Sequence, residues 1–189
     1  MDFFDLYMNR MQLLASIIDP NKLFVEAGRA TGKTEGIIGP RTVRVAASMP
    51  RETSAFAHKT YMALFSNIIP NLIAYYHTSK TPTGEPMLQE GKDFVIGEKD
   101  LPKHFIPPRY PLIHPEHTIV FANGHNIRLV ASDQAESIAG SNIVHGFIEE
   151  MKHNSGEKLR TRLFPAFRVG RLSQGADRTT ASPYYAGIT

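Results

Sequence analysis

The stretch VEAGRATGKTEG (residues 25–36) decides the fold, because it combines an apolar approach, a turn of small residues and a lysine-threonine pair. It matches the phosphate-binding pattern G-x-x-x-x-G-K-S/T except at the first glycine, which is replaced by Ala27. A methyl group is tolerated there if φ stays negative. Small residues let backbone N–H groups approach phosphate oxygens at the positive end of a helix. The stretch therefore predicts a phosphate-binding turn between a strand and a helix.

Each residue of this turn has an expected role. Lys33 should reach the β- and γ-phosphate oxygens of ATP, and the Thr34 hydroxyl should bind Mg²⁺. Arg29 is a candidate catalytic arginine that swings toward the γ-phosphate, and a surface arginine paired with an acid is the alternative. The predicted ATP-binding residues are Gly28, Arg29, Ala30, Thr31, Gly32, Lys33 and Thr34.

A P-loop ATPase also needs an apolar strand that ends in acids, and VHGFIEE (residues 144–150) has this pattern. Glu149 is predicted to hold Mg²⁺, and Glu150 is predicted to be the general base, which makes Glu150, Arg29 and Lys33 the candidate catalytic residues. The alternative is a pair of solvated acids at the start of a helix. Aspartate is more usual at the first acid, so the longer Glu149 side chain leaves the division of roles open.

Hydrophobic periodicity predicts one α/β domain over residues 1–189, with a β-hairpin around Asn123-Gly124. Gly39-Pro40 should kink or restart one helix, and Pro70 should bend another. Residues 78–114 are rich in proline, glycine and lysine and are predicted to form a surface excursion. The predicted helices are residues 2–18, 33–48 and 61–76, and the predicted strands are 22–27, 53–59, two strands within 117–132, and 141–151.

Composition restricts the function without defining it. The chain has 189 residues with 42% hydrophobic and 21% charged residues, no cysteine and a net charge of +3. Disulfides and thiolate metal sites are excluded. Eight histidines lack metal-ligand spacing, and the sequence contains neither a basic signal-peptide region nor an apolar run of membrane-spanning length.

The order of these pieces resembles the large terminases, the ATP-driven DNA-packaging motors of tailed bacteriophages. The resemblance runs from FVEAGRATGKT through SMPR, TIVFANGHNIRLVAS and SIAGSNIVHGFIEE to TTASP (residues 179–183). It implies an ASCE-type P-loop NTPase fold with a mainly parallel central sheet flanked by helices. It also implies that Thr180 and Ser182 couple ATP hydrolysis to movement. Ala139-Gly140, where an arginine often stands beside the glycine, and Glu149 depart from the family pattern.

The resemblance further implies that ATP and Mg²⁺ drive double-stranded DNA into a viral procapsid. The partners would be DNA held by its phosphates, a portal protein, a small terminase subunit and further copies of the chain in a ring, which in this family is usually a pentamer. The motor would work in the host cytoplasm, docked on the procapsid. The sequence stops in mid-pattern at Thr189, so we expect a fragment of a longer protein that lacks a C-terminal nuclease domain. Lys80, Lys92, Lys99, Lys103 and Arg109 are candidate DNA contacts, although a solvated loop explains them as well.

Other functions fit parts of the pattern. A helicase-like translocase shares the phosphate loop and the acid strand but usually has a second lobe. A small-molecule kinase would need a lid, for which residues 78–114 could be mistaken. An inactive P-loop scaffold would be compatible with Ala27 and Glu149.

Overall fold

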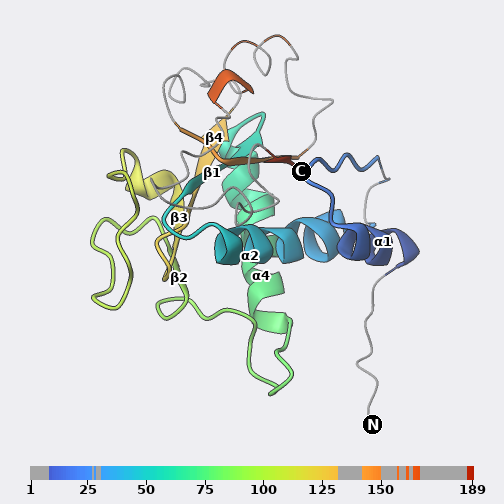
Figure 1. The fold of residues 1–189 in the computed structure, drawn as a ribbon, viewed down its shortest axis with the longest axis horizontal. Helices are drawn as coiled ribbons and strands as arrows, with labels where there is room; N and C mark the ends of the chain where they lie inside the picture. Colours follow the sequence, from blue (N-terminus) through green and yellow to red (C-terminus); the bar gives the residue numbers. More distant parts are fainter. Residues whose placement is uncertain are drawn as a thin grey trace, which may run out of the picture.

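The structure is a computed structural model that describes residues 9–26, 28, 31–131, 142–149, 157, 161, 164–166 and 187–189. It is an α/β fold built on a six-stranded sheet with the strand order β2-β3-β4-β1-β5-β6 (Figure 1). The strands are β1 (Thr53–His58), β2 (Phe94–Ile96), β3 (Thr118–Phe121), β4 (Asn126–Ala131), β5 (His145–Ile148) and β6 (Gly187–Ile188). The helical elements are α1 (Arg10–Ile18), η1 (Thr34–Ile38), α2 (Gly39–Ser48), α3 (Tyr61–Ala63), η2 (Leu64–Ile68), α4 (Ile69–Thr78), η3 (Pro115–His117) and η7 (Phe164–Ala166).

The sheet is mixed. Strand β1 is parallel to β4 and β5, and β5 is parallel to β6, whereas β3 is antiparallel to both β2 and β4. Parallel strands need a long crossover, and between β1 and β4 the connection includes the helical elements α3, η2 and α4. The predicted α/β class is therefore confirmed, with parallel strands at the centre and an antiparallel extension at one edge.

The side chains of β1 alternate between two apolar layers, as the pleat of a strand requires. Phe56 packs with α2 and α4 on one face, in a cluster that includes Phe147 of β5. Ala55 and Ala57 face the other side, where the cluster includes Ala166 of η7. Figure 1 shows α2 and α4 crossing beside the strands. A core on each face fixes the sheet and the positions of its strand ends.

Both predicted proline breaks coincide with a change of helix type. The π-helical turn η1 precedes Pro40, and the π-helical turn η2 precedes Pro70. In each case the N–H group just before the proline bonds five residues back, from Gly39 to Thr34 and from Ile69 to Leu64. Proline has no N–H group, so an uninterrupted α-helical ladder is impossible at these points. The wider turn keeps the helix continuous through the break.

The predicted hairpin is confirmed, and its turn also fixes the end of α2. Strands β3 and β4 pair antiparallel, and Gly124 has a φ of 82°. The Asn123 side chain donates to the Ala46 carbonyl at 2.7 Å, and His125 Nδ1 lies 2.7 Å from the Met49 carbonyl. These contacts satisfy carbonyl groups that a helix end otherwise leaves unpaired.

Several expectations need correction. Residues 23–26 form no strand, and the Phe24 side chain is 66% exposed, because no described strand pairs with this segment and covers it. Of the predicted first helix, the described part starts at Arg10, and residues 1–8 lie outside the described residues. Residues 78–114 are more than a surface excursion, because they contribute strand β2, in which Phe94 is fully buried.

The helices also bear on membrane insertion. Within the part of the chain that the structure describes, no helix combines the length and the apolar character needed to cross a bilayer.

Candidate functional site

The predicted phosphate-binding turn, called the phosphate loop below, folds back on itself at its lysine. Lys33 Nζ donates to the Gly28 carbonyl at 2.6 Å, and Thr31 Oγ1 donates to the same carbonyl at 3.0 Å. Gly32 has a φ of 67°, a conformation that glycine adopts without the steric cost a Cβ would bring. The turn leads directly into η1, which begins at Thr34. The loop residues Ala27, Arg29 and Ala30 lie outside the described residues.

The fold brings the two predicted Mg²⁺ ligands together. Thr34 Oγ1 donates a hydrogen bond of 2.9 Å to Glu149 Oε1, although the two residues are 115 positions apart in the chain. Thr34 is placed by the start of η1, and Glu149 is the residue directly after β5. The Glu149 N–H also donates to the Ala57 carbonyl at 3.2 Å, which ties the acid to the end of β1.

This pair is chemically suited to a hard divalent cation. A hydroxyl and a carboxylate oxygen are the ligand types that Mg²⁺ prefers, and Mg²⁺ usually keeps several waters beside one or two protein ligands. The described residues contain no group of three or more acidic or histidine side chains that could hold a metal by themselves. Thr34 and Glu149 therefore fit an ion that phosphate oxygens and water help to coordinate.

Gln12 is a loop contact that the sequence analysis missed. Its side chain is buried at 7% exposure, and its Nε2 donates to the carbonyls of Thr31 at 3.2 Å and Gly32 at 2.9 Å. Its Oε1 accepts from the Asn9 N–H at 2.8 Å, while Asn9 Oδ1 accepts from the Gln12 N–H at 3.0 Å. This reciprocal pair is a capping box, so the N-x-x-Q pattern could have located the start of α1. It could not have shown that Gln12 supports the phosphate loop.

Gly36 makes room for this glutamine. A Cβ atom at Gly36 would lie 2.3 Å from Cδ and Nε2 of Gln12, closer than any real contact. Any larger residue at position 36 would therefore have to displace the end of the Gln12 side chain from its place against the loop.

The remaining predicted site residues are not brought into the site by the described structure. Arg29, Ala30, Glu150, Thr180 and Ser182 lie outside the described residues, so their roles stay predictions.

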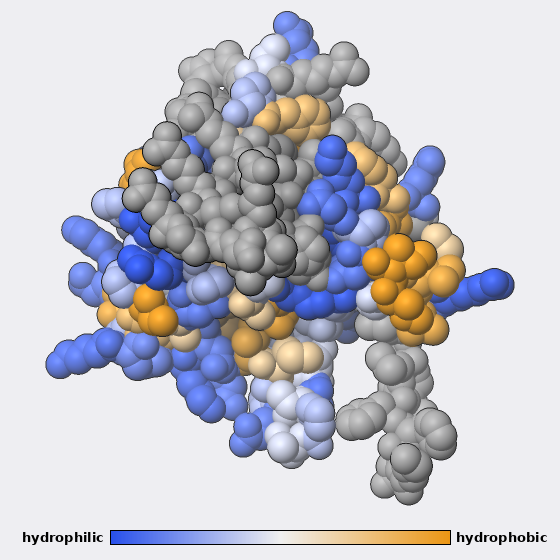
Figure 2. All heavy atoms as spheres, viewed as in Figure 1, coloured by the Kyte–Doolittle hydropathy of each residue, from blue (hydrophilic) through white to orange (hydrophobic). Residues whose placement is uncertain are grey.

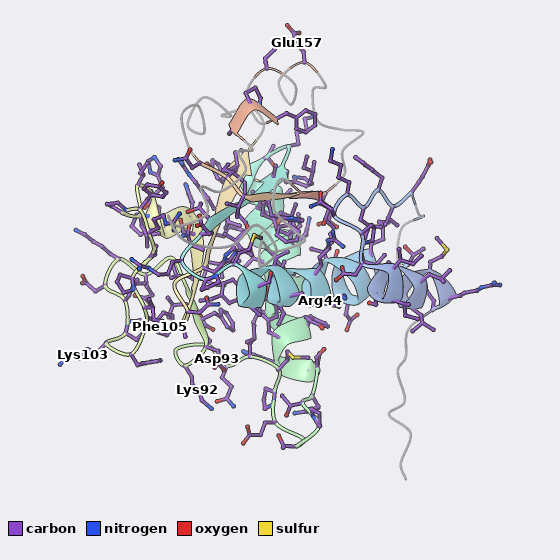
Figure 3. All side chains as sticks on the ribbon, in the orientation of Figure 1. Arg44, Lys92, Asp93, Lys103, Phe105 and Glu157 are labelled. Atoms are coloured by element: carbon purple, nitrogen blue, oxygen red, sulfur yellow. The ribbon has the colours of Figure 1, made fainter. Side chains whose placement is uncertain are left out.

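The candidate DNA contacts divide into two kinds. Lys80, Lys92, Lys99 and Lys103 are exposed. Figure 3 shows Lys92 and Lys103 pointing away from the sheet. Arg109 instead forms a 2.8 Å ion pair with Glu52, whose side chain is 7% exposed and whose carboxyl pKa is raised by burial. Arg109 therefore has a structural role in holding residues 106–109 against the start of β1.

Comparisons with protein family models, with curated proteins and with solved structures found no match. Function is therefore inferred from the geometry of Lys33, Thr34 and Glu149 and from the sequence motifs around them.

Proposed function

We propose that this chain is the ATP-hydrolysing domain of a viral DNA-packaging motor of the large terminase type, with a P-loop NTPase fold of the ASCE type. The observation that carries the ATPase part is the 2.9 Å contact between Thr34 Oγ1 and Glu149 Oε1. It joins a hydroxyl at the start of a helix to a carboxylate at the end of a parallel strand. Ligands of open α/β sheets bind at this edge, beyond the carboxyl ends of the strands.

The residues divide the work of phosphoryl transfer. The backbone N–H groups of residues 28–34 cradle the phosphates, and the Lys33 ammonium leaves the Gly28 carbonyl to bind the β- and γ-phosphate oxygens. Thr34 and Glu149 hold the Mg²⁺ site. When bound, Mg²⁺ neutralises charge on the β- and γ-phosphate oxygens. Glu150 accepts a proton from the attacking water, and Arg29 or an arginine of a neighbouring subunit stabilises the charge on the γ-phosphate.

The motor part of the proposal rests on the ordered resemblance of the motifs to large terminases. Packaging must proceed along any DNA sequence, so the grip should involve phosphates, and exposed lysines such as Lys92 and Lys103 provide charge of the right sign. A helicase-like translocase uses the same ATP chemistry. It differs from a packaging motor in the partners that it binds.

Nucleotide binding tests the ATPase proposal directly. The purified chain should bind a fluorescent ATP analogue saturably with Mg²⁺, and Lys33→Ala should abolish that binding. Lys92→Ala, which removes an exposed lysine outside the loop, is the matched control and should bind as the parent does. Equal binding by Lys33→Ala, or no binding by the parent at millimolar nucleotide, contradicts the proposal.

Turnover then separates an enzyme from an inactive scaffold. Glu150→Gln should keep nucleotide binding and lose ATP hydrolysis. Hydrolysis that rises with double-stranded DNA of any sequence, and whose stimulation weakens with added salt, supports the motor. If the parent binds ATP but does not hydrolyse it, even with DNA present, the chain is a scaffold.

A further inference from the structure

Helix α1 reverses the usual pattern of a surface helix, which buries apolar side chains and exposes polar ones. All residues of α1 are described, and its buried side chain is that of Gln12, which supports the phosphate loop. On the opposite side of the helix the apolar residues Leu14, Ile17 and Ile18 are exposed, the two isoleucines at 70% and 67%. We call these three residues the α1 stripe. Figure 2 shows apolar side chains gathered on this part of the surface.

A second apolar feature is a hollow of about 620 Å³ between residues 99–101 and residues 107–115. Four prolines line it together with Lys99, Leu101, Arg109, Tyr110, Leu112 and Ile113. The Ile113 side chain is 71% exposed, so the hollow is open to solvent. An apolar helix face and an apolar hollow are the two halves of a helix-in-groove contact.

The hollow is held firmly against the sheet. The Arg109 N–H donates to the Arg51 carbonyl at 3.0 Å, and the Arg109 side chain forms its ion pair with the buried Glu52. The Tyr110 hydroxyl accepts a hydrogen bond of 3.4 Å from Asn142, just before β5. The prolines further restrict the backbone, because each one fixes its own φ. A receptor surface that is already ordered loses little conformational entropy when a partner binds.

The α1 stripe and the hollow belong to opposite ends of the molecule. Figure 1 shows α1 at the right end of the long axis and residues 99–115, coloured yellow-green to yellow, at the left end. Figure 3 labels Lys103 and Phe105 of that segment on the left. One chain therefore cannot seat its own stripe in its own hollow, but a second copy can. Two different surfaces that fit each other give a heterologous contact, which repeats from copy to copy.

We propose that copies of this chain associate head to tail, with the α1 stripe of one copy seated in the hollow of the next. Burial of apolar surface drives this contact. A lipid surface would cover the stripe but would give the hollow no role, whereas a second copy occupies both. The contact involves neither nucleotide nor metal, so this inference is independent of the proposed function.

Charge does not oppose this contact, because exposed charges of both signs are balanced near each surface. They are Arg10, Lys22, Glu26 and Glu35 near α1, and Glu98, Lys99, Asp100 and Lys103 near the hollow. The association should therefore strengthen in sodium sulfate, which favours apolar burial, and a contact held by exposed ion pairs would weaken as salt screens them.

Sedimentation velocity without nucleotide is the first test. The parent should form species larger than a monomer, and their fraction should rise with protein concentration and with added sodium sulfate. A parent that stays monomeric up to millimolar protein overturns the inference, as does association that salt abolishes. Either result leaves the nucleotide-binding test of the proposed function unaffected.

A mixing experiment then tests the head-to-tail arrangement. Ile17→Asp places a charge on the stripe, and Ile113→Asp places one at the hollow. Both side chains are exposed, so the fold should tolerate each change. Each variant alone should associate about tenfold or more weakly than the parent, because a carboxylate would be buried in the contact. An equal mixture should form one-to-one dimers that grow no further, since the first variant keeps its hollow and the second keeps its stripe.

Met62→Asp is the matched control. Met62 is 81% exposed on α3 and belongs to neither surface, so this variant should associate as the parent does. Undiminished association of Ile113→Asp would indicate contact between two stripes and would overturn the inference. Failure of the mixture to form dimers overturns it as well. A monomeric parent that binds phosphatidylcholine vesicles, with binding lost in Ile17→Asp, would assign the stripe to a lipid surface instead.

Discussion

Asp19 ends α1 in a left-handed conformation, and its Oδ1 lies 2.7 Å from NH1 of Arg41, a side chain that is 1% exposed. Arg41 also donates to the carbonyls of Pro20 and Asn21, and Arg44 reaches the second Asp19 oxygen at 3.1 Å. Figure 3 shows Arg44 where α2 meets α1. The C-terminal end of α1 is thus bound to α2, while Gln12 near its N-terminal end is bound to the phosphate loop. Helix α1 therefore connects the loop to the helix that follows it.

The Asp19–Arg41 pair should be a major contribution to stability. Asp19→Asn keeps a residue that tolerates positive φ but removes the charge that balances the buried guanidinium. We expect the free energy of unfolding to fall by about 3–5 kcal/mol, because the Arg41 charge then stays buried without a carboxylate. Urea unfolding followed by circular dichroism measures the loss. Arg44→Gln is the control: its side chain is 34% exposed, and the expected loss is below about 1 kcal/mol. Similar losses in the two variants would show that the burial of Arg41 does not determine how much its ion pair contributes to stability.

Gln12 and Gly36 should act as one unit. Gln12→Ala removes two hydrogen bonds to loop carbonyls and should lower the free energy of unfolding by about 1–3 kcal/mol. Gly36→Ala should have a similar effect, because its methyl group would displace the Gln12 side chain. The double variant should lose clearly less than the sum of the single losses, as expected for residues in direct contact.

Met11→Ala is the control for these variants, since Met11 lies on the same helix and is 63% exposed. Its unfolding curve should match that of the parent. Strict additivity of Gln12→Ala and Gly36→Ala would mean that the two residues act through separate contacts.

His125 should make the protein less stable in mild acid. Its ring is fully buried, its Nδ1–H donates to the Met49 carbonyl, and its Nε2 has no hydrogen-bond partner among the described residues. Burial lowers the pKa of His125 from 6.5 to about 4. Because the folded pKa lies below the unfolded one, the unfolded chain binds the proton more readily, and stability falls as the pH drops through this window. The expected loss from this group is about 2 kcal/mol between pH 7.5 and pH 5.

Urea unfolding at pH 7.5, 6 and 5 measures this loss for the parent and for His125→Gln, which cannot take up the proton. The pH dependence should flatten in His125→Gln and should remain in His104→Gln, where the histidine is exposed. An identical slope in all three proteins would locate the acid sensitivity elsewhere.

The sequence predicted best those structural elements whose conformation is determined by one or two neighbouring residues. The Asn123-Gly124 turn predicts its hairpin because few residues adopt the required conformation, and Pro40 and Pro70 predict helix breaks because proline lacks a donor. The strand predicted at residues 22–27 was wrong over residues 23–26, since an apolar run becomes a strand only where a neighbour pairs with it. Figure 2 shows apolar side chains on the surface near α1, where the exposed ones include Met11, Ile17 and Ile18.

Contacts between residues far apart in the chain were predictable only where a chemical rule connects the two residues. Thr34 and Glu149 could be linked in advance because ATP chemistry needs a hydroxyl and an acid at one metal, and the structure places their oxygens 2.9 Å apart. No comparable chemical rule connects Gln12 to the loop carbonyls or Arg109 to Glu52. Those contacts depend on how α1 and residues 106–109 pack, which one-dimensional patterns do not encode.

Gly124 and Gly84 form a matched pair that separates backbone strain from steric packing. Their φ angles are 82° and 84°, so alanine is strained at both, at a cost of about 1–2 kcal/mol. A Cβ at Gly84 would meet no atom within 4 Å, whereas a Cβ at Gly124 would lie 2.8 Å from the Ile106 carbonyl oxygen and 3.0 Å from Arg51 Cγ. The Ile106 carbonyl cannot easily retreat, because Arg51 Nε donates to the adjacent Pro107 carbonyl at 3.1 Å.

Gly124→Ala should therefore cost about 1–3 kcal/mol more than Gly84→Ala, measured by urea unfolding of both variants and the parent. Equal losses would mean that residues 106–107 move away from the hairpin turn without penalty. They would then be a loosely attached loop and not a fixed part of the contact between the turn, α2 and β1.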